Sequence, residues 1–201
     1  MLIFSHAGMP DRTKAILSGE HETFLNAIIP DLRILENWGA SNIAIPCNTS
    51  HYFYDVIQKQ INIPIIHMPR ESVRTAAAMM GDIKMQRSIG IMATDGTVQA
   101  GIYHRECEAL GIRPVSPSKE AQKSVMSLIY DDIKAGRPGD PDKFRTAFED
   151  LKRQGSDMVI LACTEISVFK KDNPVPGICL DAMDVLVKES IVRSGGEYIP
   201  V

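Results

Sequence analysis

Two short apolar runs, each ending in a cysteine, constrain the fold of this chain more than any other feature. The first run is Ile43 to Cys47, and it continues into the polar stretch Asn48 to His51. The second is Val159 to Cys163, more than half a chain length later, and it continues into Thr164 and Glu165. A short apolar run bounded by polar residues is typical of a buried strand. Both runs therefore predict a strand that delivers a thiol to a polar loop, and two such strand ends suggest one shared site.

The charge and the hydrophobic content indicate an ordinary globular protein with a small-molecule ligand. Of the 201 residues, 44% are hydrophobic and 23% are charged, and the net charge is −3. There is no basic excess, which argues against a nucleic-acid or anionic-membrane partner. The N-terminus lacks the pattern of a signal peptide, and no apolar run approaches about 18 residues. We expect a cytoplasmic protein with no nucleic acid and no membrane as partner.

The four cysteines have neither the density of a disulfide framework nor the spacing of a zinc site. Cys47, Cys107, Cys163 and Cys179 include no Cys-x-x-Cys pair, and His51 after Cys47 is a single match to ligand spacing. We interpret all four as free thiols of a reducing compartment and expect no metal.

Short apolar runs alternate with amphipathic segments along most of the chain, which predicts parallel sheets covered on both faces. A turn-rich loop is expected at 8–13, and the Glu22 to Asn37 helix has Pro30 inside it. We predict strands at Leu2 to Ser5, Asn42 to Pro46, Ile63 to Met68, Ser88 to Ala93, Ile112 to Val115, Met158 to Ala162 and Ile178 to Leu180. We predict helices at Glu22 to Asn37, His51 to Gln60 (with Phe53, Val56 and Ile57 inward), Glu71 to Met80, Val98 to Leu110, Ser118 to Lys134, Phe144 to Arg153 and Ala182 to Arg193.

In a doubly wound α/β sheet, the loops at the carboxyl ends of the strands build the site. Four loops meet that description here: Cys47 to Ser50, His67 to Met68, Thr94 to Thr97 and Cys163 to Glu165. A domain boundary near 82–87 would divide the chain into two halves of similar plan, each with a cysteine at the end of one strand.

Two thiols facing one bound molecule can carry out a specific reaction without a cofactor. Loop amides, hydroxyls and helix N-termini lower the pKa of a thiol toward neutrality. A thiolate on one face can then remove a proton from a carbon while a thiol on the other face delivers one. This is cofactor-independent racemisation, with Cys47 and Cys163 as the acid and base. A buried strand-end cysteine on its own is more often a packing residue.

The carbanion beside a carboxylate needs hydrogen-bond donors, and an acidic side chain needs a fixed cation. The donor candidates are Asn48, Thr49, Thr97 and Thr164. Arg12 and Lys134 are the cation candidates, although each also fits a solvated surface charge.

Several further residues have two interpretations that the sequence does not separate. Glu165 either stabilises a helix start through the helix dipole or binds a substrate ammonium. His51 caps a helix or faces solvent at the helix start, or it tunes the Cys47 thiol, and His67 is a weaker candidate at a strand end. Cys107 and Cys179 fit packing roles.

These motifs resemble the aspartate/glutamate racemase family, the PLP-independent two-cysteine amino-acid racemases. The resemblance covers nearly the whole chain. The matching segments are Ile45 to His51, Leu161 to Ile166, Ala93 to Thr97 with Gly101 to Tyr103, Pro10 to Thr13 and Ile129 to Gly136.

The resemblance implies two similar doubly wound α/β domains with parallel sheets, related by a pseudo-two-fold axis, with the active site in the cleft between them. The expected domains are 1–84 plus 180–201, and 85–179. It also implies a homodimer, an acidic amino acid (aspartate or glutamate) as substrate, no cofactor, and Cys47 and Cys163 as the catalytic pair. The implied substrate-binding residues are Arg12, Asn48, Thr49, Ser50, Thr94, Thr97, Lys134, Thr164 and Glu165.

One departure from the family pattern concerns the beginning of the chain. Relatives normally place a strand, a glycine-rich loop and a helix before the strand that Met1 to Phe4 resembles. Loss of a central strand exposes a sheet edge. We therefore expect weak or absent activity from the 201-residue form.

Two rival functions remain open from the sequence. The first is a racemase-like fold that binds an acidic metabolite or a partner without catalysis. The second is a redox thiol protein, which would require a reversible disulfide between Cys47 and Cys163.

Overall fold

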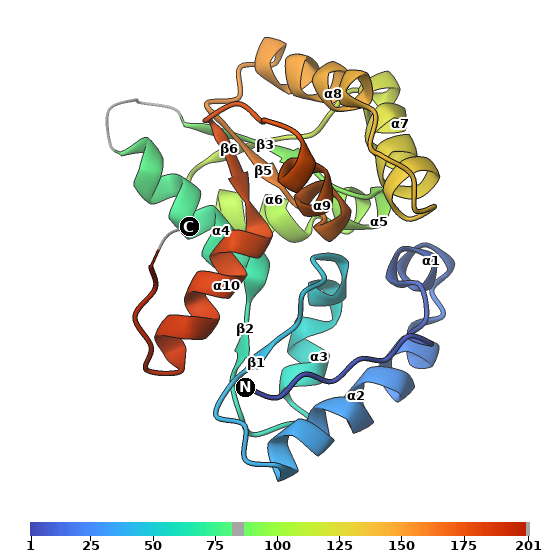
Figure 1. The fold of residues 1–201 in the computed structure, drawn as a ribbon, viewed down its shortest axis with the longest axis vertical. Helices are drawn as coiled ribbons and strands as arrows, with labels where there is room; N and C mark the ends of the chain where they lie inside the picture. Colours follow the sequence, from blue (N-terminus) through green and yellow to red (C-terminus); the bar gives the residue numbers. More distant parts are fainter. Residues whose placement is uncertain (82–86, 200–201) are drawn as a thin grey trace.

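The computed structural model describes residues 1–81 and 87–199 and contains two parallel sheets, the larger in the upper half of Figure 1 and the smaller in the lower half. Each pairing between described strands is parallel, which confirms the α/β prediction. The small sheet is β1 (Ile43–Ala44) beside β2 (Ile65–Ile66). The larger sheet has the order β4 (Arg113–Val115), β3 (Ser88–Met92), β5 (Met158–Leu161) and β6 (Cys179–Asp181).

Helices cover both faces of the larger sheet because successive strand residues point to opposite sides. On β3, Ile89 and Ile91 join one apolar cluster, while Met92 joins the other. The first face is covered by α4 (Met68–Met80), α6 (Ile102–Glu108) and α10 (Ala182–Arg193). The second is covered by α7 (Lys119–Ser127), α8 (Pro141–Arg153) and α9 (Thr164–Asp172).

The small sheet has its own core. Phe24, Ile28 and Ile57 pack with Ile43 and Ile65, one from each strand. The surrounding elements are α1 (Arg12–Ser18), α2 (His21–Asn37, with Pro30 inside it), the 3-10 turn η1 (Thr49–Phe53) and α3 (Tyr54–Gln58). The short helix α5 (Asp95–Gln99), which follows β3, contacts α1 and η1.

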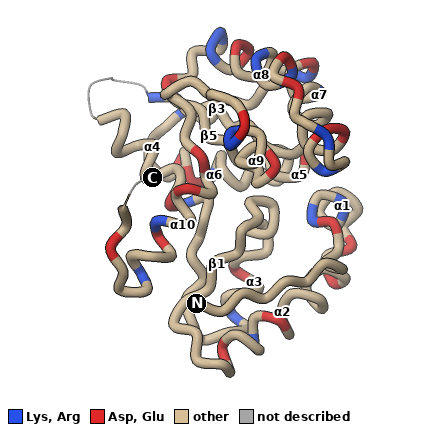
Figure 2. The backbone as a smooth tube through the Cα atoms, viewed as in Figure 1, with Lys and Arg blue, Asp and Glu red and all other residues tan. Residues whose placement is uncertain are grey.

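Charged residues of both signs lie on the outer helices. Lys and Arg are interspersed with Asp and Glu along α7 and α8 (Figure 2). The strands β1, β3 and β5 carry no charged residue. No helix in the described part of the chain has both the length and the apolar character that crossing a membrane requires.

The predicted strand at Leu2 to Ser5 is wrong. Residues 1–6 have no regular secondary structure, and residues 1–8 are exposed. A strand forms only where a neighbouring strand satisfies its backbone groups, and β1 pairs with β2 instead. The helix that follows was not expected: α1 begins at Arg12, where Asp11 caps it by accepting a hydrogen bond from the Lys14 amide at 2.8 Å.

Two predicted helices are interrupted. The helix expected over Val98 to Leu110 is two helices, α5 and α6, because Gly101 between them has φ +64°, in the left-handed region that favours glycine. The helix expected over His51 to Gln60 begins as the 3-10 turn η1, and Val56, expected to point inward, is 48% exposed.

The helix expected over Ser118 to Lys134 changes its hydrogen-bond pattern midway. After α7, residues Leu128–Ile133 form a π-helical turn (η2), and the Lys134 amide donates to the Ile129 carbonyl. Single π turns inside helices are frequent at functional sites. Tyr130, within this turn, and Lys134, which follows it, both line the pocket described below.

The expected domain limits stay a prediction. The 84/85 boundary falls in 82–86, outside the described residues. At the other limit, Leu180 pairs with Ile160 in the larger sheet, while α10 packs against α4 (Figure 1).

Candidate active site

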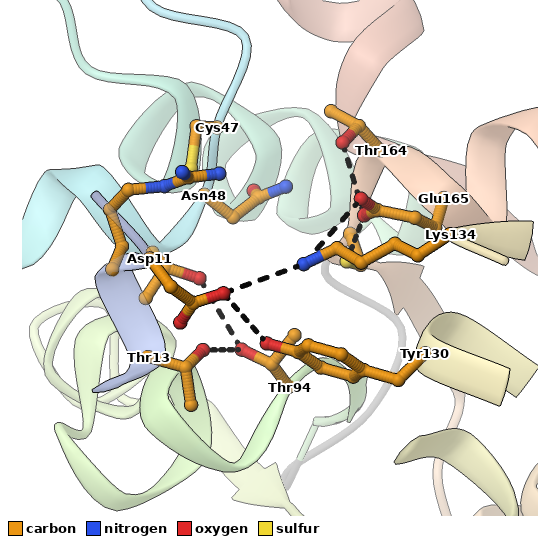
Figure 3. A pocket seen from close by; sticks show the side chains of 12 residues that line it. Asp11, Thr13, Cys47, Asn48, Thr94, Tyr130, Lys134, Thr164 and Glu165 are labelled. Atoms are coloured by element: carbon orange, nitrogen blue, oxygen red, sulfur yellow. Dashed lines mark hydrogen bonds and ion pairs between the residues drawn. The ribbon is translucent and has the colours of Figure 1, made fainter. Parts of the chain in front are cut away.

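One pocket gathers most of the predicted site residues. It lies between the two sheets' carboxyl ends and holds about 330 Å³ of empty space, part of it open to solvent (Figure 3). Its wall consists of Asp11, Arg12, Thr13, Cys47, Asn48, Thr49, Thr94, Tyr130, Lys134, Cys163, Thr164 and Glu165. Segments far apart in the chain therefore meet here, as the strand-end rule predicts.

The Cys47 thiol lies after β1, in a turn closed by a hydrogen bond from its own amide to the Ile45 carbonyl at 2.7 Å. It is partly exposed and lies beside the Arg12 guanidinium. Burial tends to lower the pKa of Arg12, but the neighbouring Cys47, Asp11 and Glu165 raise it overall. Arg12 is therefore a permanent cation next to this sulfur.

The Cys163 thiol, at the end of β5, has the opposite surroundings. It is 7% exposed, and its sulfur donates to Oε2 of Glu165 at 2.8 Å. Burial, and then the Glu165 carboxylate, raise the pKa of Cys163 well above its usual value. The structure therefore holds this sulfur as a thiol.

Four buried threonine hydroxyls form a network beside the thiols. The Thr94 oxygen lies 3.3 Å from that of Thr49 and 3.3 Å from that of Thr13. Thr97, behind them, is 2.9 Å from Thr49 and 3.2 Å from Thr94. A hydroxyl both donates and accepts, so this network can turn donors toward an anion in the pocket.

A second group of donors surrounds Asn48. Its side-chain oxygen accepts from the Tyr103 hydroxyl at 2.5 Å, which orients the amide. The Asn48 Nδ2 atom is buried and has no partner. A buried donor without a partner costs free energy, so this nitrogen is available to a ligand in the pocket.

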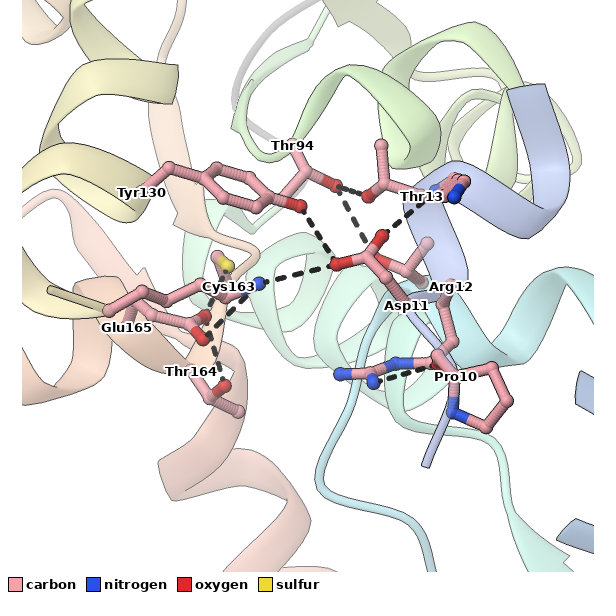
Figure 4. Close-up of polar contacts among 12 residues, drawn as sticks. Pro10, Asp11, Arg12, Thr13, Thr94, Tyr130, Cys163, Thr164 and Glu165 are labelled. Carbon is pink, nitrogen blue, oxygen red and sulfur yellow. Dashed lines mark hydrogen bonds and ion pairs between the residues drawn. The ribbon is translucent and has the colours of Figure 1, made fainter. Parts of the chain in front are cut away.

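Lys134 is held between two carboxylates, those of Asp11 and Glu165 (Figure 3). Its Nζ is 3.8 Å from Asp11 Oδ2, 3.9 Å from Glu165 Oε1 and 4.0 Å from the centre of the Tyr130 ring. Burial tends to lower the pKa of Lys134, but Glu165, Tyr130 and Asp11 raise it overall. The Tyr130 hydroxyl donates to Asp11 Oδ2 at 3.4 Å (Figure 4). The pocket thus holds two cations and two carboxylates.

The structure places nine of the eleven predicted site residues on the pocket wall. Ser50 and Thr97 are buried but do not line the pocket. The predicted residues on the wall are Arg12, Cys47, Asn48, Thr49, Thr94, Lys134, Cys163, Thr164 and Glu165.

Sequence reasoning missed three wall residues: Asp11, Thr13 and Tyr130. A signal existed for each. Asp11 and Thr13 flank Arg12 in the first turn of a helix, and Tyr130 lies one helical turn before Lys134.

The remaining candidates lie outside the pocket wall. Cys107 is fully buried in the core, where burial and the nearby Glu106 raise its pKa to about 12. Cys179 is half-buried against the second apolar cluster, and burial raises its pKa to about 12. His51 and His67 are buried behind Cys47, with ring centres 5.2 Å apart. Among residues 1–81 and 87–199, no cluster of three His, Cys, Asp or Glu side chains could hold a metal ion.

Comparisons with known proteins point to one family. The chain is 26% identical over 149 residues to the broad specificity amino-acid racemase RacX of Bacillus subtilis, covering 74% of this chain and 62% of that protein. It is 27% identical over 143 residues to the glutamate racemase of Koribacter versatilis, covering 68% of this chain and 45% of that protein. The chain thus spans between about half and two thirds of the length of these relatives.

The fold is similar to that of the Picrophilus torridus aspartate racemase, with a TM-score of 0.77 at 23% identity over 98% of this chain and 80% of that one. The model of the Asp/Glu/Hydantoin racemase family matches residues 1–190. A match over nearly the whole chain, together with this fold and the paired strand-end cysteines, establishes that the chain belongs to the Asp/Glu/Hydantoin racemase family.

Proposed function

We propose that this chain racemises an acidic amino acid, aspartate or glutamate, by proton transfer between Cys47 and Cys163. One observation carries the proposal: thiols from the strand ends of the two sheets line a single pocket. Membership of the racemase family supports the same reaction class.

The surroundings of Cys163 support one assignment of the two roles. Cys163, which donates to Glu165, is the thiol that supplies a proton, so Cys47 is the base. The Cys47 thiolate removes the α-proton, and the bond's electrons remain on the α-carbon as a carbanion. The Cys163 thiol then gives its proton to the opposite face of this carbon. The enantiomer leaves, the two sulfurs have exchanged protonation states, and the reverse reaction follows the opposite order.

The α-carboxylate has to be held by donors, because charge develops beside it in the transition state. The unpartnered Asn48 Nδ2 and the hydroxyls of Thr49 and Thr94 are suitable, since all three residues line the pocket. Preorganised donors cost no reorganisation when the carbanion forms.

The side-chain carboxylate and the α-ammonium of the substrate match the four charged residues of the pocket. Arg12 and Lys134 suit the distal carboxylate. Asp11 and Glu165, which flank Lys134 in the structure, suit the ammonium. None of these steps calls on PLP or on a metal ion.

Deuterium exchange tests the proposal. Incubation with L-aspartate or L-glutamate in heavy water should introduce deuterium at the α-carbon. Mass spectrometry measures the deuterium, and chiral chromatography measures the D-enantiomer that is formed. Cys47→Ser and Cys163→Ser should each abolish interconversion in both directions, whereas Cys107→Ser, in the core, should retain it if the protein folds. No deuterium exchange with either amino acid would contradict the proposal and would agree with the absence of activity that the sequence comparison with the family allowed.

A second candidate is binding of an acidic metabolite without catalysis. The small sheet has only two strands in the described part of the chain, which leaves the Cys47 turn with less backbone support than Cys163 has. Thermal stabilisation by aspartate or glutamate, without deuterium exchange, would favour this candidate.

A further inference from the structure

We propose that His51 is a positioning residue that holds the Cys47 thiol at the pocket through the backbone of Cys47. The inference rests on the proposed two-cysteine reaction and adds a residue that lies outside the pocket wall. His51 is 4% exposed and lies between the ends of β1 and β2.

The imidazole of His51 connects two backbone segments. Its Nδ1 is 2.9 Å from the Cys47 carbonyl oxygen, and its Nε2 is 3.2 Å from the Met68 amide nitrogen. Met68 is the first residue of α4, so its N–H has no acceptor within the helix. His51 therefore joins the turn that carries Cys47 to the start of α4.

These contacts select one tautomer. A neutral imidazole has one donor and one acceptor nitrogen. With the proton on Nδ1, the ring donates to the Cys47 carbonyl and accepts the Met68 N–H. With the proton on Nε2, the ring would donate to the Ile66 carbonyl at 3.3 Å, but the Met68 N–H would lose its acceptor and Nδ1 would face an oxygen lone pair. The Nδ1–H tautomer satisfies both shorter contacts.

The surroundings keep this ring neutral. Burial lowers the pKa of His51, although the hydrogen bond to the Cys47 carbonyl acts to raise it. The ring also points at a helix N-terminus, where a positive charge is unfavourable. His67 next to it accepts the Arg70 N–H at 3.1 Å, so two neutral histidines cap the same helix start. Only His51 reaches from there to Cys47.

The position of the Cys47 sulfur depends on this contact. The amide of Cys47 bonds to Ile45 within the same turn, whereas its carbonyl bonds to a side chain anchored on α4. The His51 amide in turn donates to the Asn48 carbonyl at 3.1 Å. Loss of the ring would free the turn that carries both the thiol and the Asn48 amide.

Isotope effects distinguish positioning from simple stabilisation. For one enantiomer Cys47 removes the α-proton, and for the other it returns one. In Cys47→Ser, which no longer interconverts the enantiomers, the enantiomer whose α-proton still exchanges with heavy water is the one that Cys163 deprotonates. We expect His51→Leu to lower kcat about tenfold to a hundredfold, with a smaller change in KM, because a misplaced reacting group costs rate rather than binding. Because the proton transfer that Cys47 performs becomes slower, the α-deuterium isotope effect should rise for the enantiomer that Cys47 deprotonates. It should fall for the other enantiomer, for which return of a proton by Cys47 then limits the rate more than removal of the α-proton by Cys163.

Two variants serve as controls. His67→Leu removes the neighbouring cap without touching Cys47, so it should lower the melting temperature but leave the isotope effects of the two enantiomers unchanged. His51→Gln keeps one donor and one acceptor at a similar separation and should recover most of the rate. The proposal is overturned if His51→Leu loses activity only in proportion to stability, with isotope effects like those of the parent chain.

Alkylation of the Cys47 thiol tests the positioning role of His51 without any measurement of activity. An inactive parent chain would therefore contradict the proposed function but not the positioning role. His51→Leu should change the rate at which iodoacetamide alkylates Cys47, because the turn that carries this sulfur is freed and the exposure of the sulfur changes. His67→Leu, which leaves the contact between His51 and Cys47 in place, should keep the rate of the parent chain. An unchanged rate in His51→Leu, measured by peptide mass spectrometry, would refute the positioning role.

Discussion

At the scale of single residues, the two pocket thiols are distinguished by one charged neighbour each. Cys47 has the Arg12 guanidinium, and Cys163 has the Glu165 carboxylate as a hydrogen-bond acceptor at 2.8 Å. The sequence alone left open whether Glu165 stabilises a helix start or binds an ammonium group. The structure adds a third role, because Glu165 favours the protonated form of the neighbouring sulfur.

Replacing Glu165 by glutamine should lower the pKa of Cys163. Burial and the Glu165 charge both raise that pKa, so removing the charge leaves only the burial effect. Alkylation of Cys163 should therefore begin at lower pH than in the parent chain, as measured by peptide mass spectrometry across a pH series. Glu149→Gln, on the exposed side of α8, is the matched control and should leave the Cys163 profile unchanged. A profile that stays in place or moves to higher pH in Glu165→Gln would contradict this role.

At the scale of elements, the seven-residue helix α1 and its N-cap residue Asp11 supply three consecutive wall residues, and α1 packs against α5. A Cβ built on Gly96 in α5 would lie 2.9 Å from the Cα of Thr13. Only glycine permits this approach of the two backbones. The contact holds α1 beneath α5 in Figure 1 and places Arg12 next to Cys47.

Gly96→Ala should therefore reduce racemisation although alanine favours helices by up to about 1 kcal/mol over glycine. The added methyl group meets backbone atoms, so α1 has to shift and carry Arg12 and Thr13 with it. We expect a loss of about tenfold or more in kcat/KM, in line with the cost of misplacing a binding group. Gly177→Ala, where no atom lies within 4 Å of the new methyl group, is the control. Equal activity of the two variants would show that the α1–α5 contact does not set the pocket geometry.

At the scale of the whole molecule, the two buried histidines at the start of α4 couple folding to pH. Burial lowers the pKa of His51, and burial together with His51 and Arg70 lowers that of His67 to about 3. The unfolded chain binds protons at these sites below about pH 6.5, whereas the folded chain does not. The histidines thus contribute stability that is complete above pH 6.5 and is lost as the pH falls toward 3.

Urea unfolding at a series of pH values checks this expectation. Below pH 6 the free energy of unfolding should fall by at most about 1.4 kcal/mol per pH unit for each histidine. His67→Leu should reduce that slope while lowering the stability at pH 8. A slope that is the same in the parent chain and in His67→Leu would show that His67 is charged in the folded state.

The parallel α/β plan could be predicted from the alternation of apolar runs, because buried strands such as Val159 to Leu161 have a distinctive pattern. The predicted ends of these strands then indicated where both thiols of the pocket lie. The predictions that failed concern features that depend on contacts between residues far apart in the sequence. Leu2 to Ser5 has strand-like residues but lacks a neighbouring strand in the structure, and Gly101 breaks a helix whose residues have helical periodicity. The π turn of Leu128–Ile133 was also not predicted, because it has no clear sequence signature.

Asp11, Arg12 and Thr13 form one uninterrupted tripeptide that contributes an anion, a cation and a hydroxyl to the pocket. Neither proposed proton carrier belongs to it, but the Arg12 guanidinium lies beside the Cys47 sulfur. In the proposed reaction, one codon therefore specifies both a group that recognises the distal carboxylate and the charged neighbour of a proton carrier. A substitution of Arg12 that favours neutral amino acids would also change the surroundings of Cys47. Redirecting the site toward neutral side chains at this codon thus carries a cost in proton transfer.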